Sequence, residues 1–302
     1  MNKNGKNFKI FGVRHGIAGD LCFALPVLNY LELKYPNSYK YWLISKKCSQ
    51  FAPLFLNHKL IDCIRITGEY ETLNSDDKQL ANSCDLIINT EPQCPDGMPG
   101  TTEKSCWWNY YNCYEMAFRM AGFDVKEYRE MPKELQFPVL NQWFDVKKQD
   151  KTIGIWGFTS YGKDSTRSPS VNWWIDLVRM ILKETDYTIY QFGGEKEPDI
   201  NPIDNINASR IVRHNNLPIL DQYKLALGCN LNINTNSGSG IILGAYGAKQ
   251  ITLLTNDAPN HYKNPLAFAP LNYKDNNFNI FTANGFNNLD KDIILNEINK
   301  LC

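Results

Sequence analysis

The chain has 302 residues, of which 43% are hydrophobic and 21% are charged. This length suits two domains, and the composition is that of a folded protein, so disorder, collagen and coiled coil are excluded. Thirty-two Lys and Arg balance thirty-two Asp and Glu. This net charge of zero disfavours electrostatic binding of nucleic acid by the protein surface as a whole. No apolar run reaches the roughly 18–20 residues that cross a bilayer, and residues 1–7 carry no secretory signal, so we expect a cytoplasmic protein without a membrane span.

The nine cysteines are scattered and form no C-x-x-C pair. In a chain of this size without a secretory signal, this pattern is typical of reduced thiols. The four histidines show no metal-binding spacing, and His214 lies in a polar stretch where we expect it to be exposed. We therefore expect neither a metal nor a cofactor.

Strands alternate with helices along the first half of the chain, which is the pattern of a parallel α/β domain. A helix over 21–35 contains Pro26, which either kinks it or marks its true start. Strands are expected at 8–13, 39–44, 61–67 and 84–89, and further helices at 50–57 and 107–121.

Residues 129–150 contain two prolines and end in a polar run, so we expect a linker there between domains 1–145 and 151–302. Two consecutive α/β halves predict two parallel sheets that face each other across a cleft, where ligands of this architecture bind. In the second half, strands are expected at 152–156, 188–192, 210–212, 231–234, 250–254 and 278–281, and helices at 173–183, 219–227, 241–246 and 289–301.

The first candidate site is the loop after the first strand, residues 14–20 (R-H-G-I-A-G-D). Its small residues, Gly19 among them, allow a ligand to approach the backbone closely. Asp20 could act as general base on an acceptor hydroxyl, or it could simply cap the following helix. Arg14 and His15 would lie near the acceptor or a phosphate. The loop is not a G-x-G-x-x-G fingerprint, so a dehydrogenase is disfavoured.

The second candidate site follows the strand at 152–156. Thr159 and Ser160 supply hydroxyls there, and Lys163 and Arg167 supply cations before a helix begins. This combination suits a diphosphate, although the segment does not match the P-loop motif. The alternative is an ordinary solvated loop with Ser170 capping the helix.

Two further loops carry candidate ligand-binding residues. Gly193 and Gly194 end a strand, and Glu197 after them could hold a ribose diol or be a surface acid. The second loop leads from a strand to an apolar helix and could be an anion-binding nest or a flexible turn. Its candidate residues are Asn236, Ser237, Gly238 and Ser239.

Taken in order, these segments resemble glycosyltransferase family 9, the ADP-heptose:lipopolysaccharide heptosyltransferases, over nearly the whole chain. The resemblance implies the GT-B fold, which consists of two Rossmann-like domains facing across a cleft, with the acceptor on the N-terminal domain, a nucleotide-sugar on the C-terminal domain and usually no metal. The matching landmarks are Gly16 to Asp20 with Pro26; Thr159, Ser160, Arg167 and Trp174; Gly193, Gly194 and Glu197; and residues 234–247.

The resemblance also implies roles for individual residues. Asp20 matches the catalytic base and Glu197 the ribose contact, while Thr159, Ser160 and Arg167 match the diphosphate contacts. This sequence departs from the family at three positions. Asn236 replaces an Asp, Ile241 replaces a His, and Arg167 stands where a Lys is usual. The loop between Ser160 and Arg167 is also longer than usual, which leaves Lys163 as a rival cation.

These features predict an inverting glycosyltransferase that moves a sugar from a nucleotide-diphosphate sugar to a hydroxyl of a glycan or lipopolysaccharide-like acceptor. One alternative is a phage-type enzyme that glycosylates DNA bases. DNA would then be a partner, which the net charge of zero disfavours. Another is a catalytically silent nucleotide- or glycan-binding module of the same fold.

Overall fold

The computed structural model describes residues 8–14, 18–53, 60–67, 73–90, 112–136, 146–158, 168–202, 208–235, 237–255, 276–282 and 285–302. The side chains of Ala18, Asp20 and Ala208 are outside this description. The chain divides into two compact units, Met1–Trp143 and Phe144–Cys302.

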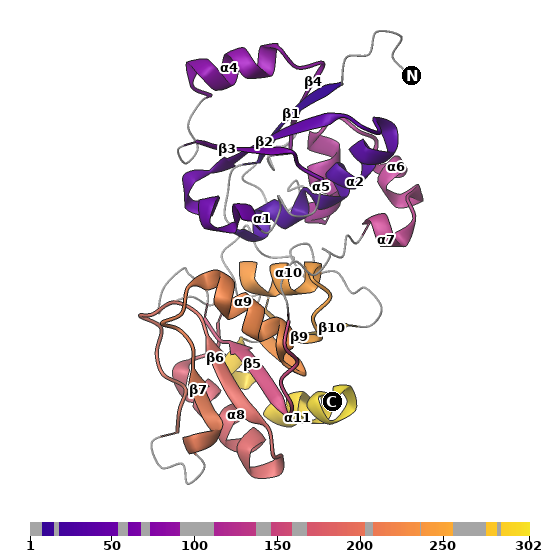
Figure 1. The fold of residues 1–302 in the computed structure, drawn as a ribbon. Coiled ribbons are helices and arrows are strands. Elements are labelled where there is room, and N and C mark those ends of the chain that lie inside the picture. The colour runs from indigo at the N-terminus through magenta and orange to yellow at the C-terminus, as the bar shows by residue number, and fades with distance from the viewer. Residues whose placement is uncertain are drawn as a thin grey trace. The chain divides into compact units, whose positions relative to one another are not determined.

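The N-terminal unit is built on a four-stranded parallel sheet in the order β3-β2-β1-β4. In Figure 1, α4 lies above this sheet, and α1, α2 and α5 lie below it. The α4 side is packed by Phe11, Leu43 and Ala81. The strands are β1 (Lys9–Arg14), β2 (Tyr39–Ser45), β3 (Cys63–Thr67) and β4 (Leu86–Asn89), and the helices are α1 (Ala18–Phe23), α2 (Leu25–Lys34), α4 (Ser75–Asn82) and α5 (Cys113–Met120).

Pro26 marks a helix start rather than a kink. Ala24 separates α1 from α2, and Pro26 is the second residue of α2. A proline at that position loses nothing, because the first N–H groups of a helix have no intrahelical partner.

The predicted linker begins too early. Two short helices, α6 (Val125–Glu130) and α7 (Lys133–Gln136), occupy the first part of 129–150. Asp124 and Glu127 form a capping box at the start of α6. This box marks the helix start, whereas a helix this short shows no hydrophobic periodicity from which it could be predicted. Of the predicted helix at 50–57 the structure describes residues 50–53, in which a 3₁₀ helix, η1 (Lys46–Phe51), ends and Ala52 and Pro53 are α-helical.

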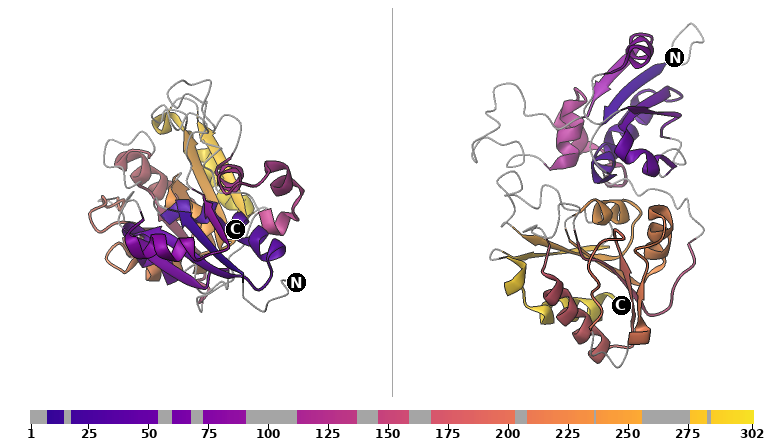
Figure 2. Two further views of the ribbon diagram at one scale, coloured as in Figure 1. Left: turned by 90° about the horizontal axis from the view of Figure 1, so that it is seen from above. Right: turned by 90° about the vertical axis from the view of Figure 1, so that its left-hand side faces the viewer.

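The C-terminal unit contains a six-stranded, wholly parallel sheet in the order β10-β9-β8-β5-β6-β7. Figure 2 shows helices on both of its faces, with the orange α9 and α10 on one side and α8 and the yellow α11 on the other. The strands are β5 (Thr152–Trp156), β6 (Thr188–Phe192), β7 (Ile211–Arg213), β8 (Leu231–Thr235), β9 (Gln250–Thr255) and β10 (Asn277–Thr282), and the helices are α8 (Val171–Glu184), α9 (Ile219–Gly228), α10 (Gly238–Ala245) and α11 (Lys291–Leu301).

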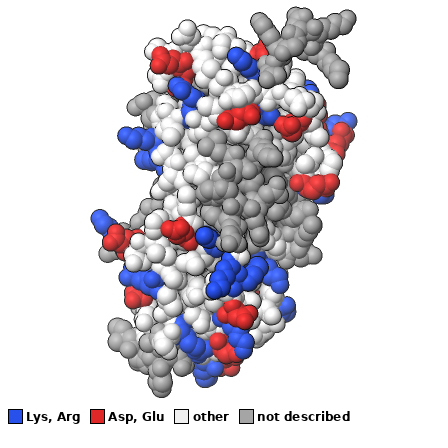
Figure 3. Space-filling view, viewed as in Figure 1, with Lys and Arg blue, Asp and Glu red and all other residues white. Residues whose placement is uncertain are grey.

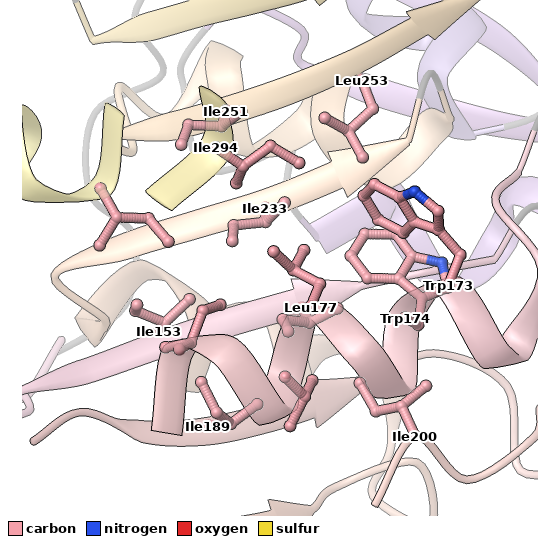
Figure 4. Packing of buried hydrophobic residues seen from close by; sticks show 14 of the residues in the cluster. Ile153, Trp173, Trp174, Leu177, Ile189, Ile200, Ile233, Ile251, Leu253 and Ile294 are labelled. Atoms are coloured by element: carbon pink, nitrogen blue, oxygen red, sulfur yellow. The ribbon is translucent and has the colours of Figure 1, made fainter. Parts of the chain in front are cut away.

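The main core of this unit lies between the sheet and helices α8 and α11. Figure 4 shows isoleucines of the strands packed against Leu177 and two neighbouring indoles at the start of α8. Trp173 and Trp174 meet edge to face, with 5.2 Å between ring centroids. The indole N–H of Trp174 donates to the Gly157 carbonyl over 2.9 Å, which ties the end of β5 to α8. Ser170 caps α8 by accepting from the Trp173 N–H at 3.2 Å.

Candidate functional site

The strand order places a topological switch point between β5 and β8. From β5 the chain continues outward through β6 to β7, whereas β8, β9 and β10 extend in the opposite direction. Ligands of open α/β sheets bind outside the carboxyl ends of the strands at such a point. Thr159, Ser160, Lys163 and Arg167 follow β5 but lie outside the described residues, as does Asn236 after β8.

Helix α10 begins at this edge of the sheet. It starts at Gly238, three residues before the predicted start, so Gly238 and Ser239 belong to its first turn and not to a flexible loop. Ser237 is the N-cap residue, but its hydroxyl lies 2.6 Å from that of Ser239 and, within the described chain, caps no backbone N–H. The first turn therefore presents N–H groups that favour an anion.

A buried pair of amides fixes α10 on the sheet. Asn234 donates to the Gln250 side-chain oxygen over 2.7 Å, and Gln250 donates to the Gly240 carbonyl over 3.0 Å. A side chain at Gly240 would approach the Asn234 Cβ to 3.3 Å, so the helix lies close against β8. Both amides are fully buried, so the first turn of α10 is held rigidly.

Polar atoms without partners are buried at the same end of β8. Within the described part of the chain, the Asn234 Oδ1 and Thr235 Oγ1 atoms have no hydrogen-bond partner. Such atoms are rare in native proteins and often mark functional sites. Ile241 is 6% exposed and contributes an apolar side chain to α10.

Glu197 is half-buried rather than a fully exposed surface acid, and its Oε2 atom is buried. Its Oε2 atom has no hydrogen-bond partner among the described residues. Burial raises the pKa of Glu197 to about 7, against the opposing effects of a hydrogen bond from the Gly194 backbone and of the Arg213 charge. The carboxylate lies against Gly193, whose φ of 139° suits glycine and where a side chain would overlap the carboxylate.

Several amide side chains around Glu197 carry no motif and were missed by the sequence analysis. Gln191 on β6 donates to the Pro198 carbonyl over 2.7 Å and accepts from the Ile200 N–H at 3.3 Å. Gln222 and Asn215 contact the two glycines. Their partners are distant in sequence, so no local pattern identified them.

The expectation that His214 is exposed is wrong. The backbone N–H of His214 donates to the Gln191 carbonyl over 2.8 Å, which continues the pairing of β6 with β7. The imidazole consequently stacks on Phe192, with 5.6 Å between centroids and 21° between planes, and meets Tyr190 edge to face at 4.7 Å. This burial lowers the pKa of His214.

In the N-terminal unit, the carboxyl end of β1 carries the other candidate residues. Arg14 is buried, and its guanidinium donates to the Thr90 carbonyl at the end of β4. Gly19 is buried within α1. Asp20 is the third residue of α1 and therefore not its N-cap, while His15 lies outside the described residues.

No group of three or more His, Cys, Asp or Glu residues that could hold a metal ion occurs within the described ranges. Among the helices of the same ranges, none has the length and hydropathy needed to cross a membrane. Figure 3 shows acidic side chains interspersed with basic ones on the visible face of both units.

Several solved structures with the same architecture are glycosyltransferases. E. coli ADP-heptose lps heptosyltransferase II aligns with a TM-score of 0.68 at 12% identity over 97% of this chain and 98% of its own. A family 9 glycosyl transferase from Veillonella parvula aligns with a TM-score of 0.64 at 15% identity over 99% of each chain. E. coli heptosyltransferase WaaC with ADP aligns with a TM-score of 0.60 at 11% identity over 98% of this chain and all of its own.

No protein-family model and no curated protein sequence matches the chain. The structural matches confirm the predicted fold class: the protein is a two-unit α/β chain with the GT-B fold. Within that fold, the heptosyltransferase-like structures of family 9 match nearly the whole chain, in agreement with the resemblance found in the sequence.

Proposed function

We propose that this protein is a glycosyltransferase that moves a sugar from a nucleotide-diphosphate sugar to a hydroxyl of a glycan or lipopolysaccharide-like acceptor. The observation that carries the proposal is the arrangement on either side of β5. Glu197 follows β6, and the α10 N-terminus follows β8. Because neighbouring strands are about 4.8 Å apart, the strands that carry these two features, β6 and β8, are roughly 10 Å apart across the sheet, a span that suits a ribose diphosphate.

The donor would bind along this edge. The α10 N-terminus, with Ser237, Gly238 and Ser239, would receive one end of the diphosphate. The ionised Glu197 would accept hydrogen bonds from the ribose diol. Thr159, Ser160, Lys163 and Arg167 after β5, with Asn236, would complete the diphosphate contacts.

The chemistry would be an in-line displacement. Asp20 would remove the proton of the acceptor hydroxyl, whose oxygen then bonds to the anomeric carbon as the bond to the nucleoside diphosphate breaks. The configuration at that carbon would invert. Fixed N–H groups and the cations Lys163 and Arg167 would stabilise the departing diphosphate without a metal. Arg14, His15 and Gly19 would border the acceptor.

Adenine is the first base to test, because the WaaC structure contains ADP. The acceptor class is likewise proposed from the names of the matching heptosyltransferases. The test combines ADP binding with release of ADP from an ADP-sugar in the presence of a lipopolysaccharide-core acceptor.

The variant Asp20→Asn tests acceptor activation, which we assign to the N-terminal unit, separately from nucleotide binding, which we assign to the C-terminal unit. We expect this variant to bind ADP as the wild type does and to lose about 10²–10⁴-fold in transfer rate, because only base catalysis is removed. Steady-state kinetics and calorimetry measure the two properties, and Asp85→Asn, a surface carboxylate after α4, is the control. Unchanged transfer by Asp20→Asn would contradict the role of Asp20. Nucleotide binding by a wild-type protein without transfer would instead identify a silent binding module.

A further inference from the structure

The glycine turn after β6 is held by a side chain from α9. The Gln222 side-chain oxygen accepts from the Gly193 N–H at 2.8 Å, and its side-chain nitrogen donates to the Gly193 carbonyl over 3.1 Å. The same nitrogen donates to the Leu217 carbonyl over 2.9 Å. One buried amide thus satisfies both polar groups of Gly193 and one carbonyl near the start of its own helix, and only an amide has this set of donors and acceptors.

A second amide supports the same turn. Asn215, which follows β7 and is 5% exposed, donates to the Gly194 carbonyl over 3.0 Å. Arg213 donates to the Glu195 carbonyl over 3.2 Å and to the Glu197 carbonyl. The backbone from 193 to 197 is consequently fixed by side chains that come from the end of β7 and from α9.

This turn determines where the Glu197 carboxylate lies. The carboxylate occupies the space beside the Gly193 Cα where a side chain would otherwise be. The Glu197 N–H donates to the Gly194 carbonyl over 2.9 Å, so the acid is attached to the same turn at its backbone. If the Gly193 peptide rotates, the surface against which the carboxylate rests moves with it.

We propose that Gln222 is a positioning residue that acts through Gly193 to aim the Glu197 carboxylate at the ribose of a bound nucleotide. The proposal rests on the proposed function, since it needs a nucleotide at this site. Gln222 does not touch the ligand. Its effect should therefore depend on Glu197 and be confined to ligands that contain a ribose.

The experiment uses calorimetry of the full chain at pH 8 with two probes, ADP and inorganic pyrophosphate. Gln222→Met is nearly isosteric and removes all three hydrogen bonds. We expect Gln222→Met and Glu197→Gln each to weaken ADP binding about tenfold and to leave pyrophosphate binding unchanged. We expect the double variant to bind ADP no more weakly than Glu197→Gln alone, because residues that act as one unit are not additive.

Gln136→Met is the matched control for the loss of a buried amide. Gln136 is 3% exposed and donates to the Arg129 and Met131 carbonyls over 3.0 and 2.6 Å, but it lies in the other unit. Gln136→Met should lower the melting temperature, as Gln222→Met does, but should leave ADP binding unchanged. If Gln222→Met does not fold, Asn215→Ser removes the bond to Gly194 and should weaken ADP in the same direction, again without adding to Glu197→Gln.

The outcomes separate this proposal from the proposed function. Normal ADP binding by Gln222→Met beside weakened binding by Glu197→Gln would overturn the positioning role and leave the ribose contact standing. Additive effects, or an equal loss of pyrophosphate binding, would show that Gln222 merely stabilises the fold. Absence of ADP binding to the wild type, or normal ADP binding by Glu197→Gln, would overturn the assigned site itself and this proposal with it.

Discussion

Glu197 combines a raised pKa with a carboxyl oxygen that has no partner within the described residues. A carboxyl that is protonated more readily in the folded than in the unfolded chain stabilises the fold at low pH. This contribution is complete below the unfolded pKa near 4.5 and is lost as the pH rises through about 7. Above pH 7 the ionised Glu197 carboxylate therefore destabilises the folded protein. Such a destabilising charge is typical of residues that serve in ligand binding or catalysis.

Glu197→Gln should consequently stabilise the protein at pH 8. A shift from 4.5 to about 7 corresponds to roughly 3 kcal/mol, and partial exposure reduces the expected gain in the free energy of unfolding to about 2 kcal/mol. The gain should vanish near pH 4.5, where the wild-type carboxyl is protonated in the folded chain. Urea unfolding of both proteins at the two pH values measures it. An equal difference at both pH values would show that the buried charge is not the cause.

At the residue scale, the sequence indicated which loops carry chemistry but not what supports them. The paired glycines followed by an acid form a local motif, so Gly193, Gly194 and Glu197 could be singled out. Gln222 is 29 positions away from Gly193 and belongs to no motif. Its contact arises only when α9 packs against the sheet.

At the scale of elements, α10 shows how tertiary contacts override helix propensity. Gly238, Ser239 and Gly240 are poor helix formers, which explains why the sequence predicted a later helix start. The bond from Gln250 to the Gly240 carbonyl and the close contact with β8 hold this turn in helical form. The buried strands, by contrast, are short apolar runs, and their positions were predicted to within one or two residues.

Replacing Gln250 by leucine tests this support. The change leaves the buried Asn234 side-chain nitrogen without its partner and removes the bond from the Gln250 side chain to the Gly240 carbonyl, which should cost about 2–4 kcal/mol of unfolding free energy. Pyrophosphate binding should also weaken, because the first turn of α10 is no longer fixed. Thr252→Val, which removes one buried hydrogen bond of the same strand to Asn277, is the control. It should cost about 1 kcal/mol and leave pyrophosphate binding intact. Equal binding by both variants would contradict the role of this turn.

At the scale of the whole molecule, the alternation of strands and helices predicted two α/β halves, and both sheets are parallel. Parallel sheets bury both faces, so their strands appear as continuous apolar runs that are easy to recognise. The short helices α6 and α7 escaped prediction because a single turn has no measurable period. The strand order, and with it the switch point between β5 and β8, emerges only from long-range pairing.

We expect the C-terminal unit to bind a nucleoside diphosphate at this switch point. Thermal unfolding of the full chain with ADP, UDP, GDP and CDP tests it most directly. A ligand at 100 times its dissociation constant stabilises the state that binds it by about 2.7 kcal/mol. We expect a clear rise in melting temperature with one of the four, ADP being the first candidate, and a smaller rise for Glu197→Gln at the same concentration. Unchanged melting temperatures with all four nucleotides would contradict it.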